Sequence, residues 1–423
     1  MKIAVIGAGI VGVTSAYELA ADGHDVTVYE RRGAVAEETS FANAGVVAPG
    51  YVTPWASPGM PGKVLSYLFS QHAPVRLSLP LSARELGWMW KWWRACRLPV
   101  YLANRQRLQR LAFYSRERLH HLSQDLQLDY ERADGYMVLL RAEKDHAMVQ
   151  PGLQVLREAG VSFKELDAQA ARKLEPALNP DTAFHGAIHL PEDEVGNCRQ
   201  FALLLRNEAQ RLGAKFKFNT TVSRIDKGLP ATIFAANAVE PHARAEPEPF
   251  DAVLVCAGVQ AGRLLRPLGL KLPMAPVYGY SISATVREPL NAPRAALMDE
   301  RYKVAISRLG QRVRVAGSAE IGGRLDRNRE ASIQTLYKVL HDWFPGAAQL
   351  TSGVQQWKGA RPMLPDGPPV LGASGLPGVW LNLGHGSSGW ALSCGSARAV
   401  ADLIAGRDPG LDLEGLDIAR LGL

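Results

Sequence analysis

The sequence predicts a chain of mixed α/β and α+β class, in which a doubly wound unit at the N-terminus is joined to a second domain with antiparallel strands. Its 423 residues exceed what one ordinary hydrophobic core holds, so two domains are expected. Residues 2–30 read as strand, glycine-rich turn, helix and second strand. Residues 272–317 alternate between apolar and polar side chains, which is typical of antiparallel strands.

The first strand is expected at Lys2 to Ile6, a short apolar run that suits a strand buried on both faces. The next six residues, Gly7-Ala8-Gly9-Ile10-Val11-Gly12, have the spacing G-x-G-x-x-G. Val13 to Ala21 carries apolar residues at helical spacing, and Asp25 to Tyr29 is a second strand closed by Glu30. This order is the Rossmann-like arrangement that holds a dinucleotide.

The residues of this motif have distinct chemical roles. Gly7 allows a tight turn, Gly9 lets a pyrophosphate approach the backbone, and Gly12 lets the helix pack closely on the strand. Glu30 would hydrogen-bond a ribose 2′-hydroxyl, which favours FAD or NAD over NADP, although the two arginines that follow weaken this exclusion. The alternative is a glycine-rich turn that binds nothing, and the complete strand–turn–helix–strand context argues against it.

The composition limits the classes of protein to which the chain can belong. Hydrophobic residues make up 47% and charged residues 21%, as in ordinary globular domains. No stretch approaches the about 18–20 apolar residues of a membrane span, and the N-terminus does not read as a signal peptide, so a cytoplasmic location is expected. The four separated cysteines predict reduced thiols and no metal site. The net charge of +7 suits an anionic membrane surface or acidic substrates, whereas no dense basic run predicts nucleic-acid binding.

Two stretches before residue 102 admit two interpretations each. The loop Arg31 to Pro61 is either a surface connection or a functional loop that presses against a flat cofactor ring. Leu86 to Tyr101 carries four tryptophans and three cations. This composition fits an interfacial membrane helix, or a helix whose tryptophans enter the core while its cations face water.

The elements after these stretches follow from their apolar periodicity. Helices are predicted over residues 102–126, 144–159, 169–175, 198–212 and 328–344, and strands over 135–141, 161–166, 215–222, 251–257, 277–286, 302–308 and 313–317. Residues 230–249 resemble a surface hairpin. The strand at 251–257 ends at Gly258, where the chain would turn beneath an adenosine, or it is a core strand with no ligand nearby.

The C-terminal part contains a second glycine-rich turn. A strand at 379–383 leads into Gly384-His385-Gly386-Ser387-Ser388-Gly389 and a helix over 391–404. The N-terminus of such a helix can stabilise negative charge on a reduced flavin ring.

These motifs together resemble the D-amino-acid oxidase superfamily of flavoproteins, and within it the bacterial D-amino-acid dehydrogenases of the small-subunit type. The resemblance is carried by the N-terminal glycine motif with Glu30, by S-F-A-N-A-G from Ser40, V-C-A-G from Val255, G-A-R-P-M-L-P-D-G from Gly359 and G-H-G-S-S-G-W from Gly384. Further matches are P-G-Y-V-T-P-W-A-S-P-G from Pro49, Q-H-A-P from Gln71 and Y-K-V-A-I-S-R from Tyr302. The resemblance covers nearly the whole chain.

The resemblance implies two domains assembled from discontinuous segments. Residues 1–85, 195–260 and 355–423 would form the FAD-binding domain, and residues 86–194 and 261–354 a substrate domain with a large mixed or antiparallel sheet. It implies bound FAD and oxidative deamination of a D-amino acid, with D-alanine expected, to a 2-oxo acid and ammonia. Electrons would pass to a membrane acceptor such as quinone, with peripheral contact at the inner face of the plasma membrane.

The resemblance also assigns the residues that hold FAD. They lie in the first strand, turn and helix, after the second strand, in two segments near the middle of the chain and in the second glycine-rich turn. They are Ile3, Ala4, Val5, Ile6, Gly7, Ala8, Gly9, Ile10, Val11, Gly12, Val13, Thr14, Ser15, Ala16, Tyr17, Glu30, Arg31, Ser40, Asn43, Ala44, Gly45, Val222, Ala257, Gly258, Gly384, His385, Gly386, Ser387, Ser388 and Gly389.

Three residues are candidates for the substrate site. Arg361 stands where the superfamily's arginine pairs with the substrate carboxylate, and a structural ion pair is the alternative. Tyr302 stands where related enzymes place a tyrosine over the substrate, or it belongs to the core. Tyr280 ends a segment in which Tyr278 replaces the family's lysine, at a position expected to face the flavin. His385 is interpreted as a residue of the flavin loop, because hydride transfer from an amine needs no side-chain base.

Two other functions stay open on the sequence alone. One is a flavin oxidase of glycine, sarcosine, D-proline or hydroxyproline that uses oxygen. The other is a non-catalytic nucleotide-binding protein, which would be colourless when purified and indifferent to loss of Arg361. A nicotinamide dehydrogenase is disfavoured because the second glycine-rich turn suits an isoalloxazine ring.

Overall fold

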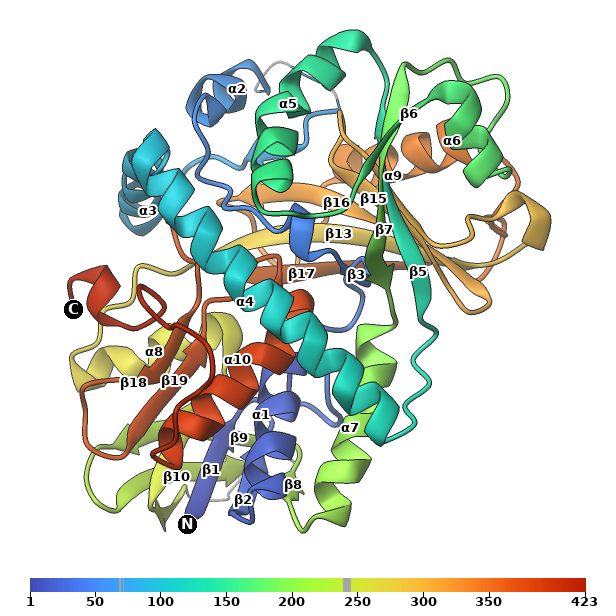
Figure 1. Ribbon diagram of the computed structural model, residues 1–423. Helices are drawn as coiled ribbons and strands as arrows, with labels where there is room; N and C mark the ends of the chain where they lie inside the picture. Colours follow the sequence, from blue (N-terminus) through green and yellow to red (C-terminus); the bar gives the residue numbers. More distant parts are fainter. Residues whose placement is uncertain (68–69, 71, 239–244) are drawn as a thin grey trace.

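The computed structural model describes residues 1–67, 70, 72–238 and 245–423, and Figure 1 shows a lower and an upper half that meet across the middle of the molecule. Within these residues the strands form a six-stranded, a three-stranded and a ten-stranded sheet. The first two lie in the lower half and the third in the upper half. The expected mixture of α/β and α+β architecture is confirmed. Gln71 and the tip of the hairpin at 239–244 lie outside the described residues.

The six-stranded sheet is built on the N-terminal βαβ unit. Its order is β18-β19-β12-β1-β2-β8, and only β18 runs antiparallel to its neighbour. These strands are β1 (Lys2–Ile6), β2 (Asp25–Tyr29), β8 (Lys215–Lys217), β12 (Ala252–Val255), β18 (Val370–Ala373) and β19 (Val379–Leu383). Because β1 lies in the middle, the turn that follows it opens at the carboxyl edge of the sheet, where α/β proteins bind ligands.

Strand β1 is buried on both faces. Ile3 and Val5 face a helical layer of α1 (Ile10–Ala21), α4 (Leu98–Asp125), α7 (Cys198–Arg211) and α10 (Gly389–Ile404). Ala4 and Ile6 face a layer formed by β9 (Thr220–Asp226), β10 (Ala231–Asn237), β11 (Glu246–Phe250) and the short helix α8 (Ala261–Leu265). Burial on both sides explains the continuous apolar run in this strand.

The ten-stranded sheet forms the upper half. Its order is β17-β13-β16-β15-β14-β5-β7-β3, with β4 added beside β16 and β6 beside β7. The strands are β3 (Val46–Val47), β4 (Val75–Leu77), β5 (Ala133–Leu140), β6 (Lys164–Asp167), β7 (Gly186–Val195), β13 (Ala275–Thr285), β14 (Ala296–Asp299), β15 (Val304–Leu309), β16 (Arg312–Ile321) and β17 (Gln355–Met363). The helices of this half are α2 (Met60–Tyr67), α3 (Ala83–Ala95), α5 (Glu143–Glu158), α6 (Ala168–Leu174) and α9 (Glu330–Trp343).

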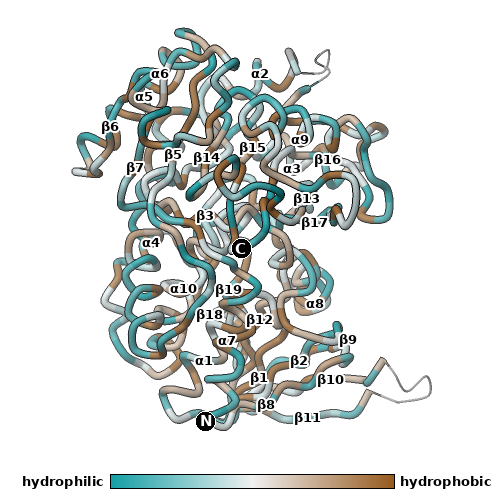
Figure 2. The backbone as a smooth tube through the Cα atoms, turned by 90° about the vertical axis from the view of Figure 1, so that its right-hand side faces the viewer, coloured by the Kyte–Doolittle hydropathy of each residue, from teal (hydrophilic) through white to brown (hydrophobic). Residues whose placement is uncertain are grey.

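Three strands carry the chain across the boundary between the halves. β3, β4 and β17 lie within ranges expected for the FAD-binding domain, yet they pair in the ten-stranded sheet. Conversely, α4 lies within a range expected for the substrate domain, and its buried face joins the core beneath α1 and α10. Figure 2 shows β17 at the level where the halves meet. Residues on β17 are therefore placed to act at this boundary.

Most expected elements are present, and several further ones were not expected, among them the strands β14, β17 and β18. Three other differences concern how a stretch is divided or read. The single strand expected at 215–222 is divided into β8 and β9, which belong to different sheets. The stretch expected as one helix from Leu86 is broken at Cys96 and Arg97 into α3 and α4. The ten-residue strand β7 was not expected, because its sequence P-E-D-E carries charges that do not read as a buried strand.

Among the described residues, no helix combines the length and apolarity needed to cross a bilayer. In the same part of the chain, no group of three or more His, Cys, Asp or Glu residues is arranged to hold a metal ion. All four cysteines are buried free thiols.

Candidate active site

The turn between β1 and α1 is shaped by three glycines. Gly7 has a φ of +101°, and its N–H donates to the carbonyl of Tyr29 at 2.8 Å. A Cβ atom on Gly12 would lie 1.9 Å from the carbonyl oxygen of Gly7, so glycine is required for this approach of helix and strand. A Cβ atom on Gly9 would meet only the hydroxyl of Ser40, at 3.5 Å. The turn therefore leaves room for a phosphate beside the N-terminus of α1.

Glu30 is fixed at the carboxyl end of β2 by two backbone donors. The N–H of Ala8 donates to Oε2 at 2.7 Å, and the N–H of Arg32 donates to Oε1 at 2.8 Å. Burial raises the pKa of Glu30, and these two donors oppose the rise. The side chains of Arg31 and Arg32 both pair with Glu38. The two arginine charges are thus engaged by a neighbouring acid, and Glu30 stands beside the glycine turn.

The loop from Ser40 to Gly45 is anchored at both ends. The hydroxyl of Ser40 accepts a hydrogen bond from the N–H of Ile10 at 3.1 Å, so it lies at the start of α1. Three consecutive carbonyls accept from three different elements: Asn43 from Arg314 at 3.1 Å, Ala44 from Ser307 at 2.7 Å and Gly45 from Trp390 at 3.1 Å. Gly45 itself has a φ of +76°. The loop is therefore held between β15, β16 and α10, rather than lying free on the surface.

The middle segments Ala257, Gly258 and Val222 lie close to this region. A Cβ atom on Gly7 would lie 2.8 Å from the carbonyl oxygen of Cys256 and 3.2 Å from Cα of Ala257, so the end of β12 backs the glycine turn. Nothing lies within 4 Å of the position that a Cβ atom of Gly258 would take. Val222 is buried on β9 in the core that also holds Ile6.

The remaining expected residues of β1 and α1 form the support beneath the turn. Most are buried in the two cores: Ile3, Ala4, Val5, Ile6, Ala8, Ile10, Val13, Ala16 and Tyr17. Thr14 donates to the carbonyls of Ile10 and Ser393, at 2.9 and 3.2 Å. Ser15 accepts from Nδ2 of Asn382 at 3.0 Å, which joins α1 to β19. These contacts position the turn. Val11 is partly buried and packs against the same core as α1.

The second glycine-rich turn, residues 384–389, joins β19 to α10 and touches the end of β17. Met363 and His385 form an isolated antiparallel bridge, and the N–H of Gly386 donates to the carbonyl of Pro362 at 3.2 Å. His385 is buried, and its Nε2 lies 3.0 Å from the hydroxyl of Ser396. Burial lowers the pKa of His385 to about 3. The imidazole is therefore neutral at physiological pH.

Arg361 lies on β17 between the two halves. Its guanidinium donates to the carbonyl of Ser318 at 2.9 Å and lies 5.9 Å from the ring of Trp55. It keeps some accessible surface although much of the chain surrounds it. Burial lowers the pKa of Arg361 to about 10, so the side chain remains charged at neutral pH. Among the described residues, no carboxylate contributes to this pKa, which leaves the cation available to an anionic ligand.

The structure does not bring the two candidate tyrosines to Arg361. Tyr280 pairs with Lys358 in the register of β13 and β17, whereas Arg361 pairs with Val277, so the tyrosine and the arginine point to opposite faces of the sheet. The hydroxyl of Tyr280 donates to Glu320 at 2.5 Å, in the core covered by α9. Tyr302 packs instead against other side chains, with Arg141 at 5.0 Å, His72 at 6.1 Å and Lys338 at 5.7 Å.

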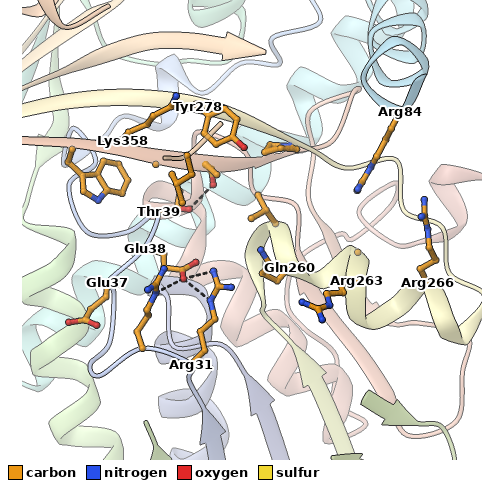
Figure 3. A pocket seen from close by; sticks show the side chains of 18 of the residues that line it. Arg31, Glu37, Glu38, Thr39, Arg84, Gln260, Arg263, Arg266, Tyr278 and Lys358 are labelled. Carbon is orange, nitrogen blue, oxygen red and sulfur yellow. Dashed lines mark hydrogen bonds and ion pairs between the residues drawn. The ribbon is translucent and has the colours of Figure 1, made fainter. Parts of the chain in front are cut away.

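A cavity of about 610 Å³ opens along the edge of β17 beside the loop that contains Ser40. Figure 3 shows side chains from both halves of the molecule directed into it. Its basic lining residues are Arg31, Arg32, Arg84, Arg263, Arg266 and Lys358. Thr39 lines it too, and its hydroxyl donates to the carbonyl of Ala360 at 2.7 Å. Of these, only Arg31 was expected. Thr39 and Lys358 lie within three residues of the candidates Ser40 and Arg361, whereas Arg84 lies near no candidate in the sequence.

The residues present fit a dinucleotide that ends in a flat ring. The backbone is open at Gly9 and Gly258, and an acid stands at the end of β2. The hydroxyl of Ser281, on the same face of β13 as Gly279, is buried without a hydrogen-bond partner within the described chain. Oδ1 of Asn382 is also buried without a partner there. Gly9 and Gly258 follow β1 and β12 of the six-stranded sheet, whereas Ser281 lies on β13 of the ten-stranded sheet.

Comparison with known proteins assigns the family. The model of the family described as FAD dependent oxidoreductase (DAO) matches residues 2–403. Proteins called D-amino acid dehydrogenase are similar over almost their whole length. The protein from Bradyrhizobium diazoefficiens is 40% identical over 99% of both chains, and that from Rhizorhabdus wittichii is 42% identical over 99% of this chain and 100% of its own.

Solved structures share the fold at lower identity. Glycine oxidase from Geobacillus kaustophilus superposes with a TM-score of 0.77 at 21% identity, covering 99% of this chain and 98% of its own. L-proline dehydrogenase from P. horikoshii has a TM-score of 0.72 at 17% identity, covering 100% of this chain and 97% of its own. The family match and the two relatives at 40% identity or more show that the chain belongs to the FAD dependent oxidoreductase family and is an oxidoreductase that uses FAD.

Proposed function

We propose that this chain oxidises D-amino acids, with D-alanine as a substrate, to imino acids that water hydrolyses to 2-oxo acids and ammonia. The relatives named D-amino acid dehydrogenase support this substrate class. The structural observation that carries the proposal is Arg361, an enclosed cation on β17 with no carboxylate partner among the described residues. An amino-acid carboxylate is the planar anion that a guanidinium binds bidentately.

The two halves of the molecule would have different functions. The turn from Gly7 to Gly12 would hold the pyrophosphate of FAD, Glu30 its ribose, and the loops 43–45 and 384–389 its ring. Bound FAD supplies the acceptor for the hydride that leaves the substrate Cα. The lower half would act as the FAD-binding domain and the upper half as the substrate domain, and β17 would belong to both functions.

The chain's own residues would act mainly by orientation. Arg361 would fix the substrate carboxylate and so align the Cα–H bond, which is the kind of positioning that lowers a barrier without a covalent step. His385 has a pKa near 3, so it is too weak a base to remove the amine proton at neutral pH. We propose no catalytic role for Tyr280, which points to the other face of the sheet, or for Tyr302, whose ring contacts Arg141, His72 and Lys338 and not Arg361.

We propose that the natural acceptor is a membrane quinone, reached from the inner face of the plasma membrane. The test is to follow D-alanine oxidation in air, with and without an artificial electron acceptor, while measuring 2-oxo acid and hydrogen peroxide. We expect turnover that depends on the acceptor and yields little peroxide. Peroxide formed at the rate of substrate loss, with glycine or sarcosine preferred, would instead identify an oxidase. A colourless protein without turnover would contradict both.

A further inference from the structure

Helix α3 has two apolar faces, and the fold uses only one of them. Trp88 and Trp92 are 3% and 9% exposed and pack on the upper sheet. Leu86, Trp90 and Trp93 are 55%, 54% and 58% exposed. The expectation that tryptophans of this stretch enter the core is therefore met by two of them, and the other two face outward.

The three exposed residues form one continuous strip. Positions 86, 90 and 93 are spaced i, i+4 and i+7, so they lie on the same face of the helix. We call Leu86, Trp90 and Trp93 the α3 ridge. Figure 1 shows α3 at the outer edge of the upper half, and the next exposed apolar residue, Leu98, begins α4. An apolar strip with two half-exposed tryptophans marks an interaction surface.

The charges around the α3 ridge are positive. Lys91, Arg94 and Arg97 are exposed, and the guanidinium of Arg94 lies 4.8 Å from the ring of Trp90. The one acid of α3, Glu85, caps the N-terminus of the helix with Ser82, and no Asp or Glu follows from Leu86 to Arg116. A surface that combines tryptophans with cations matches the interface of a bilayer, where indole rings lie at the headgroup level and cations contact lipid phosphates.

We propose that the α3 ridge docks this protein on a bilayer that contains anionic lipid. The 13 residues of α3 are too few to span the hydrocarbon core, so the helix would lie in the plane of the interface. A second copy of the chain or another protein would also cover an apolar strip. Three flanking cations against the single acid of α3, Glu85, favour an anionic lipid surface over a copy that carries the same charge.

The inner face of α3 connects this surface to the candidate active site. The indole N–H of Trp88 donates to the carbonyl of Met363 at 2.9 Å, two residues after Arg361 on β17. Docking through the outer face would therefore hold the end of β17 on the membrane side of the molecule. This position of β17 matters only under the proposed function, in which the site passes electrons to an acceptor dissolved in the bilayer. The docking of the α3 ridge on a bilayer does not depend on the proposed function.

The test is flotation of the FAD-loaded protein with vesicles of phosphatidylcholine alone or with about one third phosphatidylglycerol. We expect binding to the anionic vesicles that falls at high salt. The double variant Trp90→Gln, Trp93→Gln should bind at least about tenfold more weakly, because two half-exposed aromatic side chains no longer enter the interface. The triple variant Lys91→Gln, Arg94→Gln, Arg97→Gln should lose the preference for anionic lipid.

Matched controls separate docking from folding and from catalysis. Leu290 and Leu229 are 84% and 80% exposed elsewhere, and Leu290→Gln with Leu229→Gln should leave binding unchanged. The visible spectrum of bound flavin reports folding of every variant. The proposal is overturned if the wild type does not float, if the tryptophan variant floats equally well, or if the ridge instead holds a dimer that sedimentation shows to dissociate in that variant. Vesicle binding is measured without substrate, so a failed D-alanine assay does not affect it.

Discussion

Gly279 and Arg361 lie against each other on the paired strands β13 and β17. A Cβ atom on Gly279 would lie 2.2 Å from a terminal nitrogen of the Arg361 guanidinium, a distance that requires the arginine to move. The absence of a side chain on β13 thus determines where the cation of β17 lies.

Gly279→Ala should therefore impair substrate binding without removing FAD. Displacing one charge-assisted contact to the carboxylate costs roughly 1.5–3 kcal/mol, or about 10–100-fold in kcat/KM. Gly152→Ala in α5, where an added Cβ meets nothing within 4 Å, is the matched control and should keep full activity. Steady-state kinetics and the flavin content of both variants check this; equal kinetics would show that the position of Arg361 is not critical.

The substitution Arg361→Lys keeps the positive charge and removes the planar guanidinium group. We expect kcat/KM for D-alanine to fall by about 100-fold, because lysine offers a point charge in place of two parallel hydrogen bonds. Arg324→Lys, at an exposed arginine paired with Asp326, is the control and should change nothing. Unchanged kinetics in Arg361→Lys would argue that the carboxylate binds elsewhere.

Substitutions of two glycines in the first turn should separate an effect on folding from an effect on FAD binding. Gly12→Ala places a Cβ atom 1.9 Å from a backbone oxygen, so we expect at least about 3 kcal/mol of destabilisation or no folded protein. Gly9→Ala meets only the Ser40 hydroxyl at 3.5 Å, so the apoprotein should fold and FAD should bind more weakly. Apoprotein melting and FAD titration measure the two effects. FAD binding unchanged in Gly9→Ala would place the pyrophosphate elsewhere.

His385 predicts a specific pH dependence of stability. Its pKa is about 3 in the folded protein and 6.5 in its unperturbed state, so below pH 6.5 the unfolded chain binds a proton that the folded chain does not. This contribution to stability is complete above pH 6.5 and is lost at about 1.4 kcal/mol per pH unit as the pH falls toward 3.

The variant His385→Gln should accordingly show a shallower loss of the melting temperature between pH 7 and pH 5 than the wild type. His121→Gln, at an exposed histidine, provides the comparison. Parallel melting curves for the wild type and His385→Gln would mean that this imidazole is not held neutral by burial.

Elements that are determined by a local sequence pattern could be predicted from the sequence. The two strands of the βαβ unit have the predicted bounds, and its helix begins at Ile10, three residues before the predicted start. The unit could be located because its glycines and apolar run are consecutive in the chain. Strand β7 was missed because its buried acids are compensated by distant partners: Glu194, for example, pairs with His120 and Arg132. A local reading of charge cannot anticipate such partners.

The direction in which the side chains of the site point could not be predicted from the sequence. Spacing showed that the tryptophans of α3 occupy more than one face, but only its packing on β13 and β17 decides which face is buried. Likewise, Tyr280 and Arg361 were grouped by motif, and the register of β13 and β17 places them on opposite faces. The basic cavity lining from Arg84, Arg263 and Lys358 comes from three segments that only the tertiary structure brings together.

The most direct test of the central claim is anaerobic reduction of the bound flavin. D-alanine, and then L-alanine in a separate sample, is added to the purified protein without oxygen while the visible flavin absorption is recorded. We predict loss of the oxidised flavin band with D-alanine alone, and a much slower loss in Arg361→Lys. Bleaching by both isomers, or by glycine and sarcosine in place of D-alanine, would contradict the proposed substrate class.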